Sequence, residues 1–194
     1  MMIISVILGS TRQGRFSERP AQWILQHLRN RKEIEARLLD LRDFPMPFFD
    51  QPMPPALPGR PPYENEVVKK WTAEIAASDA FVFVTPEYNH GLTAPLKNAI
   101  DYLHSEWLCK PVGFVSYGGA AAGTRAVQML KQVVLALRML PAYEAVAISA
   151  IGDRLSADAD RFEGDHALAD AAARMLTELG CLELASRALR PGTT

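Results

Sequence analysis

The chain lacks the features that mark secreted, membrane-spanning and metal-binding proteins. It has two cysteines among 194 residues, Cys109 and Cys181, and they lie too far apart to form a CxxC pair. This usage suits a reducing compartment and predicts no metal site. No apolar run reaches about 18 residues, which is roughly what a membrane-spanning helix needs. The apolar start, residues 1–8, is too short for a signal helix. We therefore expect a cytoplasmic protein with no membrane partner.

The chain also lacks a large excess of charge of either sign. The formal net charge is -1, from 21 basic and 22 acidic residues. Such a balance offers no basic surface for nucleic acid and little attraction to an anionic membrane. It also argues against a strongly acidic electron carrier, which would use its charge to steer toward partners.

Three common nucleotide and hydrolase motifs are absent as well. There is no GxxxxGKS/T sequence, so the chain has no P-loop, and no GxGxxG fingerprint for dinucleotides. There is no GxSxG sequence with the histidine and acidic partners of a serine hydrolase.

Short apolar runs alternate with helical patterns along the whole chain. This alternation predicts a parallel sheet with helices on both faces, an α/β fold within one domain over residues 1–190, followed by a frayed tail at 191–194. The expected strands cover residues 3–8, 34–39, 80–84, 111–116 and 145–149, and the expected helices cover 17–30, 63–77, 92–103, 124–140 and 165–186.

Residues 40–62, the proline-rich segment, interrupt this rhythm. Eight prolines fall in it, which excludes a helix or a central strand. One interpretation is a solvated spacer. However, Phe44, Met46, Phe48, Phe49 and Met53 are interleaved with the prolines, and a free linker would rarely carry so many apolar side chains. The second interpretation is a segment that packs on a partner subunit or beside the active site.

The loop after the first expected strand, residues 9–17, is rich in groups that can bind an anion. It carries three hydroxyls (Ser10, Thr11 and Ser17) and two guanidinium groups (Arg12 and Arg15) ahead of a helix N-terminus. Hydroxyl donors suit the three terminal oxygens of a phosphate monoester. An ordinary strand–helix turn in which Ser17 is the N-cap explains the same residues. Glu18 counts against the phosphate unless its side chain points away.

The loop after the third expected strand can supply an aromatic ring, an amide and backbone N–H groups to a flat heterocycle. Its residues are Pro86, Glu87, Tyr88, Asn89 and His90. Glu87 and His90 could serve as acid–base groups, although a surface or capping role is the more ordinary explanation for each. A little further on, Lys97 and Asp101 have the spacing of an ion pair on a helix surface.

The loop after the fourth expected strand contains Ser116, Tyr117, Gly118 and Gly119. Glycines let the backbone approach a ring edge directly, and Tyr117 could stack on it. A wide turn is the alternative interpretation of the glycines. Arg125 could meet the phosphate of a pyridine nucleotide or merely a surface carboxylate. In a parallel sheet of this type, ligands bind outside the carboxyl ends of the strands, so these three loops should converge.

Taken together, the three loops resemble those of the NADPH-dependent FMN reductase family, which has a flavodoxin-like fold and includes chromate, quinone and azo-dye reductases. The likeness covers roughly residues 3–150, and its most specific part is P-E-Y-N-H-G followed by L-K-N-A-I-D, residues 86–91 and 96–101. The pair Arg15-Phe16 and the bulk of the proline-rich segment depart from many members.

The resemblance implies a flavodoxin-like three-layer sandwich with a five-stranded parallel sheet in the order 2-1-3-4-5. It also implies bound FMN. Ser10, Thr11, Arg12 and Ser17 would hold the phosphate; Pro86, Glu87, Tyr88, Asn89 and His90 would line the isoalloxazine; and Ser116, Gly118 and Gly119 would meet its far side.

The activity implied is an oxidoreductase that passes hydride from NADPH or NADH through FMN, in a ping-pong cycle, to a quinone, azo compound, metal oxyanion or free flavin. No protein side chain is expected to be catalytic, because the flavin carries the chemistry. A homodimer or homotetramer is implied. The alternatives are a non-enzymatic electron carrier with the same fold and a module that binds FMN without redox activity.

Overall fold

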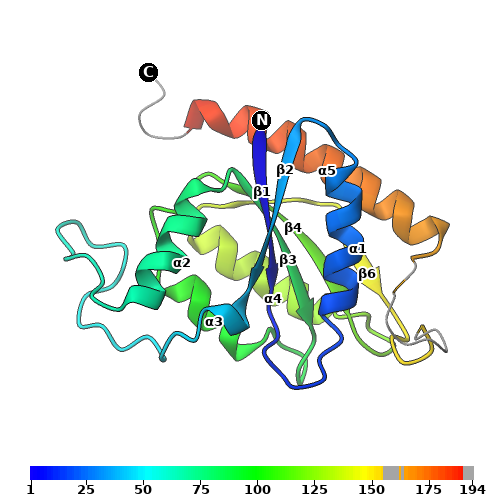
Figure 1. The fold of residues 1–194 in the computed structure, drawn as a ribbon, viewed down its shortest axis with the longest axis horizontal. Coiled ribbons are helices and arrows are strands. Elements are labelled where there is room, and N and C mark those ends of the chain that lie inside the picture. The colour runs from blue at the N-terminus through cyan, green and yellow to red at the C-terminus, as the bar shows by residue number, and fades with distance from the viewer. Residues whose placement is uncertain (155–161, 163, 190–194) are drawn as a thin grey trace.

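A parallel sheet forms the centre of the protein, as seen in a computed structural model that describes residues 1–154, 162 and 164–189 (Figure 1). The strands lie in the order β2-β1-β3-β4-β5. Strand β6 also pairs with β4, further along that strand than β5 does. Their bounds are β1 Met2–Leu8, β2 Ile34–Asp40, β3 Ala80–Pro86, β4 Pro111–Tyr117, β5 Leu140–Pro141 and β6 Val146–Ile148. The predicted order 2-1-3-4-5 is confirmed.

Helices cover both faces of this sheet and give three layers. The α-helices are α1 Glu18–Arg29, α2 Glu66–Ala77, α3 Ala94–Asp101, α4 Thr124–Ala136 and α5 His166–Ser186, with short 3-10 helices at η1 Leu41–Asp43 and η2 Arg187–Leu189. Helices α1 and α5 pack on one face, whereas α2, α3 and α4 pack on the other (Figure 1). Because every residue of β3 and β4 is buried, these strands read as continuous apolar runs.

The helix bounds follow from local capping. Helix α2 begins after Asn65, whose side chain accepts hydrogen bonds from the N–H groups of Val67 and Val68, and α3 begins after Thr93. The expected helices at 63–77 and 92–103 were therefore two to three residues too long at their starts. Among the described helices, none combines the length and apolar content that crossing a bilayer requires.

The prediction of a helix through residue 140 was wrong. Helix α4 ends at Ala136, and Arg138 takes a left-handed backbone with φ 56°. Leu140 then pairs with Pro111 at the edge of the sheet. The last strand is consequently two short pieces, β5 and β6, rather than one. The apolar pattern continued beyond the helix because Leu137 and Met139, which follow it, also pack against the core. The tail expected at 191–194 lies outside the described residues.

The proline-rich segment packs against α3 of the same chain. Pro47 O accepts hydrogen bonds from Asn98 Nδ2 at 2.8 Å and from the Tyr102 hydroxyl at 2.9 Å. The Phe49 N–H donates to Asn98 Oδ1 at 2.9 Å, and the Phe49 ring lies 5.3 Å from the Tyr102 ring. Phe48, by contrast, is 80% exposed. These contacts exclude the free-spacer interpretation for this part of the segment.

Candidate functional site

Three loops meet at the carboxyl edge of the sheet. They are the β1 loop (residues 9–17), the β3 loop (87–93) and the β4 loop (118–123). The Ser10 Oγ lies 2.7 Å from the Tyr88 hydroxyl oxygen, which joins the β1 and β3 loops. The Ser17 Oγ lies 2.5 Å from the hydroxyl oxygen of Tyr117, the last residue of β4. The predicted convergence of these segments is therefore present in the structure.

Within the β1 loop, burial separates two kinds of residue. Ser10 and Ser17 are fully buried, whereas Thr11 and Arg12 are exposed. The Ser17 side chain makes no capping hydrogen bond to α1. The N-cap explanation for its hydroxyl is thus wrong, and the hydroxyl is directed to Tyr117 instead.

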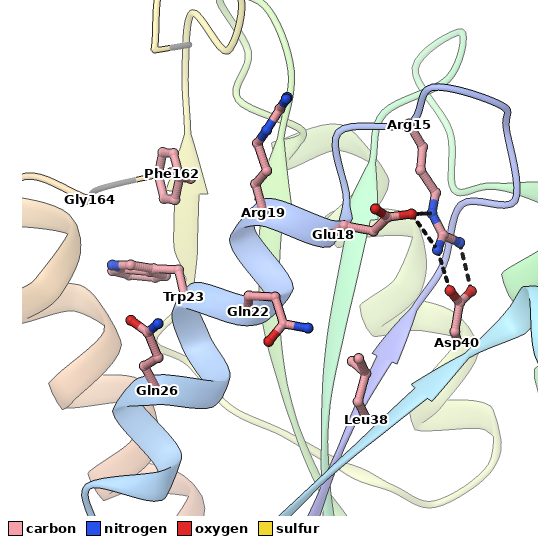
Figure 2. A pocket seen from close by; sticks show the side chains of 10 residues that line it. All are labelled: Arg15, Glu18, Arg19, Gln22, Trp23, Gln26, Leu38, Asp40, Phe162 and Gly164. Atoms are coloured by element: carbon pink, nitrogen blue, oxygen red, sulfur yellow. Dashed lines mark hydrogen bonds and ion pairs between the residues drawn. The ribbon is translucent and has the colours of Figure 1, made fainter. Parts of the chain in front are cut away.

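Arg15 extends toward Asp40 at the end of β2 (Figure 2). Its guanidinium is buried, forms an ion pair with Asp40 and bonds to Glu18 Oε1 at 3.0 Å. Burial alone would lower the pKa of Arg15, but hydrogen bonds with Asp40 and Glu18 outweigh it and raise the pKa. Likewise, burial would raise the pKa of Asp40, and hydrogen bonds from Arg15 and Arg42 lower it instead. Glu18 is held in this cluster, where its charge is paired with Arg15 and Arg42.

The β3 loop is a tight turn that exposes two polar residues. Tyr88 and Gly91 exchange backbone hydrogen bonds of 3.0 and 2.9 Å. Between them, Asn89 and His90 both have positive φ, 50° and 67°, as in the two-residue turns that join paired strands. Pro86 belongs to β3 itself. The Tyr88 N–H is used inside the turn, so a ligand at this loop would meet the exposed Asn89 and His90.

Glu87 is paired with Arg125 of α4. The Arg125 Nε donates to Glu87 Oε1 at 2.5 Å, and the Arg125 backbone N–H donates to Oε2 at 3.2 Å. The side-chain hydrogen bond from Arg125 lowers the pKa of Glu87. Two roles were considered for Arg125, and in the structure it pairs with a carboxylate. Further along, Lys97 and Asp101 form the predicted ion pair at 2.6 Å.

The β4 loop is shaped by its own backbone. The Ser116 hydroxyl donates to Ala122 O at 2.8 Å, and the Gly118 N–H donates to Ile148 O at 3.1 Å. Gly119 is exposed, and a Cβ placed on it would meet nothing within 4 Å. Gly123 has φ 79°, and a Cβ there would come within 2.8 Å of the Ser116 Cβ. Gly119 is the open point of this loop, and Gly123 is its tightest.

Tyr117 forms the floor between the β1 and β4 loops. It is 5% exposed, and its ring centre lies 5.4 Å from that of Phe16. Burial raises its pKa to about 12. Its hydroxyl is therefore protonated at neutral pH and can donate a hydrogen bond.

Sequence reasoning missed Asp40 and Arg42, which lie at the end of β2 beside the β1 loop. The Arg42 Nη2 donates to Arg12 O at 2.5 Å, and its Nε donates to Thr11 O at 3.4 Å. Their position just after a strand end was the available signal, but the carboxyl end of the second strand was not included in the expected site.

Two hollows flank the junction. An apolar one of about 560 Å³ lies between the β1 loop, the proline-rich segment and α3, and Thr11, Phe44, Phe48 and Pro95 are among its lining residues. A second, of about 670 Å³, runs along α1 from Asp40 to Phe162 (Figure 2). Across residues 1–154, 162 and 164–189, no cluster of three or more His, Cys, Asp or Glu side chains is placed to hold a metal ion.

A family model described as NADPH-dependent FMN reductase matches residues 2–153. The chain belongs to the NADPH-dependent FMN reductase family. It is an NAD(P)H-dependent flavin reductase, as the three loops had led us to expect, and not a non-enzymatic carrier.

Relatives of this flavin reductase agree with the assignment. The chain is 40% identical over 147 residues to an NAD(P)H-dependent FMN reductase of Schizosaccharomyces pombe, which covers 75% of this chain and 72% of the relative. It is 33% identical over 146 residues to an NAD(P)H-dependent FMN reductase of Saccharomyces cerevisiae, covering 71% and 76%. It is 30% identical over 142 residues to a quinone reductase of Pseudomonas putida, covering 70% and 71%.

A solved structure supports the fold. The flavoenzyme FerB, an NAD(P)H:acceptor oxidoreductase from Paracoccus denitrificans, superposes with a TM-score of 0.71 over 95% of this chain and 98% of that one, at 23% identity. At this identity the likeness establishes the flavodoxin-like fold alone.

Proposed function

We propose that this reductase binds FMN across the β1, β3 and β4 loops and uses it to pass reducing equivalents from NADPH or NADH to a small acceptor. The observation that supports this proposal most directly is the pair of hydroxyl contacts, Ser10 with Tyr88 and Ser17 with Tyr117, which bring the three loops together at one sheet edge.

The residues present fit the two ends of FMN. At the phosphate end, Ser10, Thr11, Arg12 and Ser17 supply hydroxyl, guanidinium and backbone N–H donors beside the start of α1. Arg15, the other guanidinium group of this loop, is engaged by carboxylates, so we do not place it among the direct phosphate ligands.

At the ring end, a flat heterocycle can rest against exposed groups. The turn that presents Asn89 and His90 and the open backbone at Gly119 lie on the loops that follow neighbouring strands. Gly118 adjoins this open point, but its N–H and C=O are bonded to Ile148 and Ile151. Ser116 shapes the β4 loop through Ala122 rather than offering its hydroxyl to a ligand. Pro86 and Tyr88 support the turn, and Glu87 is neutralised by Arg125.

When bound, FMN supplies the hydride and electron chemistry. The side chains hold and orient the cofactor, and none needs to act as a general base. The protonated Tyr117 hydroxyl and the Glu87–Arg125 pair keep strong uncompensated charge out of the ring site.

The acceptor is proposed to be a quinone or a similarly flat molecule. The Pseudomonas putida relative is a quinone reductase, and the apolar hollow of about 560 Å³ beside Thr11 has a size that suits a small-molecule site. An azo compound, a metal oxyanion or free flavin stays within the same proposal.

The proposal includes a homo-oligomer and a cytoplasmic location. Phe48 stands 80% exposed at the rim of the apolar hollow, and a large exposed ring at such a position is suited to a subunit contact. The two free cysteines suit a reducing compartment.

An absorption spectrum of the purified protein, with and without added FMN, tests the proposal. We expect a flavin spectrum that bleaches when NADPH or NADH is added without oxygen, followed by steady oxidation of the nicotinamide in the presence of a quinone. Ser10→Ala should weaken FMN binding, and Thr177→Ala, on the distant helix α5, serves as a matched control. A colourless protein that ignores added FMN would overturn the proposal.

A further inference from the structure

Two arginines hold three consecutive carbonyl groups of the β1 loop. The Arg15 Nη1 donates to Ser10 O at 2.6 Å. Arg42 donates to the next two, from Nε to Thr11 O at 3.4 Å and from Nη2 to Arg12 O at 2.5 Å. Both arginines lie on the β2 side of the loop, because Arg15 is paired with Asp40 at the end of β2 and Arg42 sits in η1 immediately after it. Three peptide units in a row are thus oriented from one side.

Because the peptide bond is planar, the direction of these carbonyl groups also fixes the direction of the N–H groups that follow them. The described part of the chain has no cis peptide bond, and in a trans peptide unit the C=O and the following N–H point in opposite directions. With the carbonyls of residues 10–12 drawn toward β2, the N–H groups of Thr11, Arg12 and Gln13 point away from β2. That is the side on which the β3 and β4 loops lie. The Arg12 N–H is directed at the Ser10 Oγ, 3.4 Å away, which itself contacts Tyr88 of the β3 loop. Successive N–H groups directed to one side form a concave site for an anion.

The two arginines are themselves fixed by carboxylates. Asp40 accepts hydrogen bonds from both Nη atoms of Arg15 and from the Arg42 backbone N–H, the last at 2.9 Å. Glu18 lies 3.0 Å from the Arg15 guanidinium (Figure 2). It also lies 3.3 Å from the Arg42 guanidinium and so bridges the two groups. Asp40 stands opposite Leu8 in the β1–β2 register, so the cluster ties the loop to the rigid end of the sheet.

We propose that Arg15 and Arg42 are positioning residues, anchored by Asp40, that preorganise the β1 loop so that the N–H groups of residues 11–13 face the FMN phosphate, without either guanidinium contacting that phosphate. The inference rests on the proposed binding of FMN at this loop. It assigns Arg15 a different role from the direct ligand that its sequence position suggested. A preformed loop saves the ordering entropy that a free loop would lose on binding.

Substitution of Asp40 distinguishes a positioning role of the arginines from direct contact with the phosphate, because the two roles predict changes in FMN affinity of opposite sign. Asp40→Asn removes a negative charge near the phosphate and leaves both arginines in place. If Arg15 or Arg42 bound the phosphate directly, this change would free them and FMN would bind as tightly or more tightly. If they act by holding carbonyls, the loss of their anchor loosens the loop and FMN binds less tightly.

The experiment is a titration of the flavin-free protein with FMN and with riboflavin, which has the same ring and no phosphate, followed by flavin fluorescence. We expect the Kd for FMN to rise about tenfold in Asp40→Asn, Arg15→Met and Arg42→Met, the factor that corresponds to losing roughly one hydrogen bond to a charged group. The Kd for riboflavin should change by less than about twofold on the same scale. Arg15→Lys, which keeps the charge and one donor, should recover part of the loss.

Arg19→Met is the matched control, since Arg19 lies in the first turn of α1, four residues after Arg15, and its guanidinium stacks on Phe16 rather than holding a loop carbonyl. It removes the same charge and should leave both Kd values nearly unchanged. Equal weakening by Arg19→Met, or unchanged or tighter FMN binding in Asp40→Asn, overturns the positioning role while leaving FMN binding intact. A parallel loss of riboflavin affinity in the variants overturns it as well. If the unaltered protein binds neither flavin, the proposed function itself fails. Should Arg15→Met not fold, Asp40→Asn and Arg42→Met still decide the matter.

Discussion

Two glycines of the β4 loop differ in the space that they leave for an added methyl group. Gly123 has φ 79°, and a Cβ there would lie 2.8 Å from the Ser116 Cβ, 2.9 Å from the Tyr117 N and 3.0 Å from the Tyr117 O. Two of these neighbours are backbone atoms of Tyr117, the last residue of β4, which pairs with β3 on one side and β6 on the other, so they cannot move aside cheaply. Gly119 has no atom within 4 Å of the same methyl position, and its φ lies outside the left-handed region.

The expected cost of Gly123→Ala follows from these contacts. A left-handed backbone costs an alanine about 1–2 kcal/mol, and forcing a methyl into a packed site costs about 1–3 kcal/mol more. We therefore expect a loss of roughly 3 kcal/mol in the free energy of unfolding, which lowers the Tm of a chain of this size by about 6–12 °C. Gly119→Ala should change the free energy of unfolding by less than about 0.5 kcal/mol.

Thermal and urea unfolding of the flavin-free protein measure both costs, and a titration with FMN adds the second readout. Gly119→Ala should fold normally yet bind FMN more weakly, because its methyl group enters the open face at which we place the ring. The reasoning would be refuted if Gly123→Ala were as stable as the unaltered protein, or if Gly119→Ala were the more destabilised of the two. Unchanged FMN affinity in Gly119→Ala would remove this glycine from the ring site.

Three further outcomes are expected. Because the pKa of Tyr117 is raised to about 12 in the folded state, its contribution to stability is complete below pH 10 and is lost as the pH rises toward 12. Tyr117→Phe should reduce that alkaline loss by about 2 kcal/mol in urea unfolding. Tyr143→Phe, at an exposed side chain, should leave the alkaline loss unchanged. Asn65→Ala removes the acceptor for the first N–H groups of α2 and should cost about 1 kcal/mol in the same assay, a prediction that fails if the unfolding curves superpose. Phe48→Asp should shift the protein to a smaller species in sedimentation velocity, and an unchanged sedimentation coefficient would exclude Phe48 from the subunit contact.

The fold could be predicted from local sequence patterns. The seven-residue strands β3 and β4 are buried on both faces, so they appear in the sequence as uninterrupted apolar runs, and the helical spacing between them leaves a parallel sheet as the natural arrangement. Once the strands are parallel, the loops at their carboxyl ends must share one edge. The candidate site could therefore be located from residues 9–17, 86–92 and 116–123 before any contact was known.

Other features depended on partners distant in the sequence. The helical pattern around Arg138 could not show that the chain turns there to pair Leu140 with β4, and the composition of the proline-rich segment could not show that Pro47 bonds to α3. Arg15 is the clearest case. Its place in an anion-binding loop suggested a phosphate ligand, but whether a guanidinium meets a phosphate or a carboxylate is decided by the groups folded around it. Asp40, 25 positions away, is brought to Arg15 only by the pairing of β2 with β1. Backbone preferences and hydrophobic periodicity act over a few residues and are written locally, whereas the partner of a charged side chain is a property of the assembled sheet.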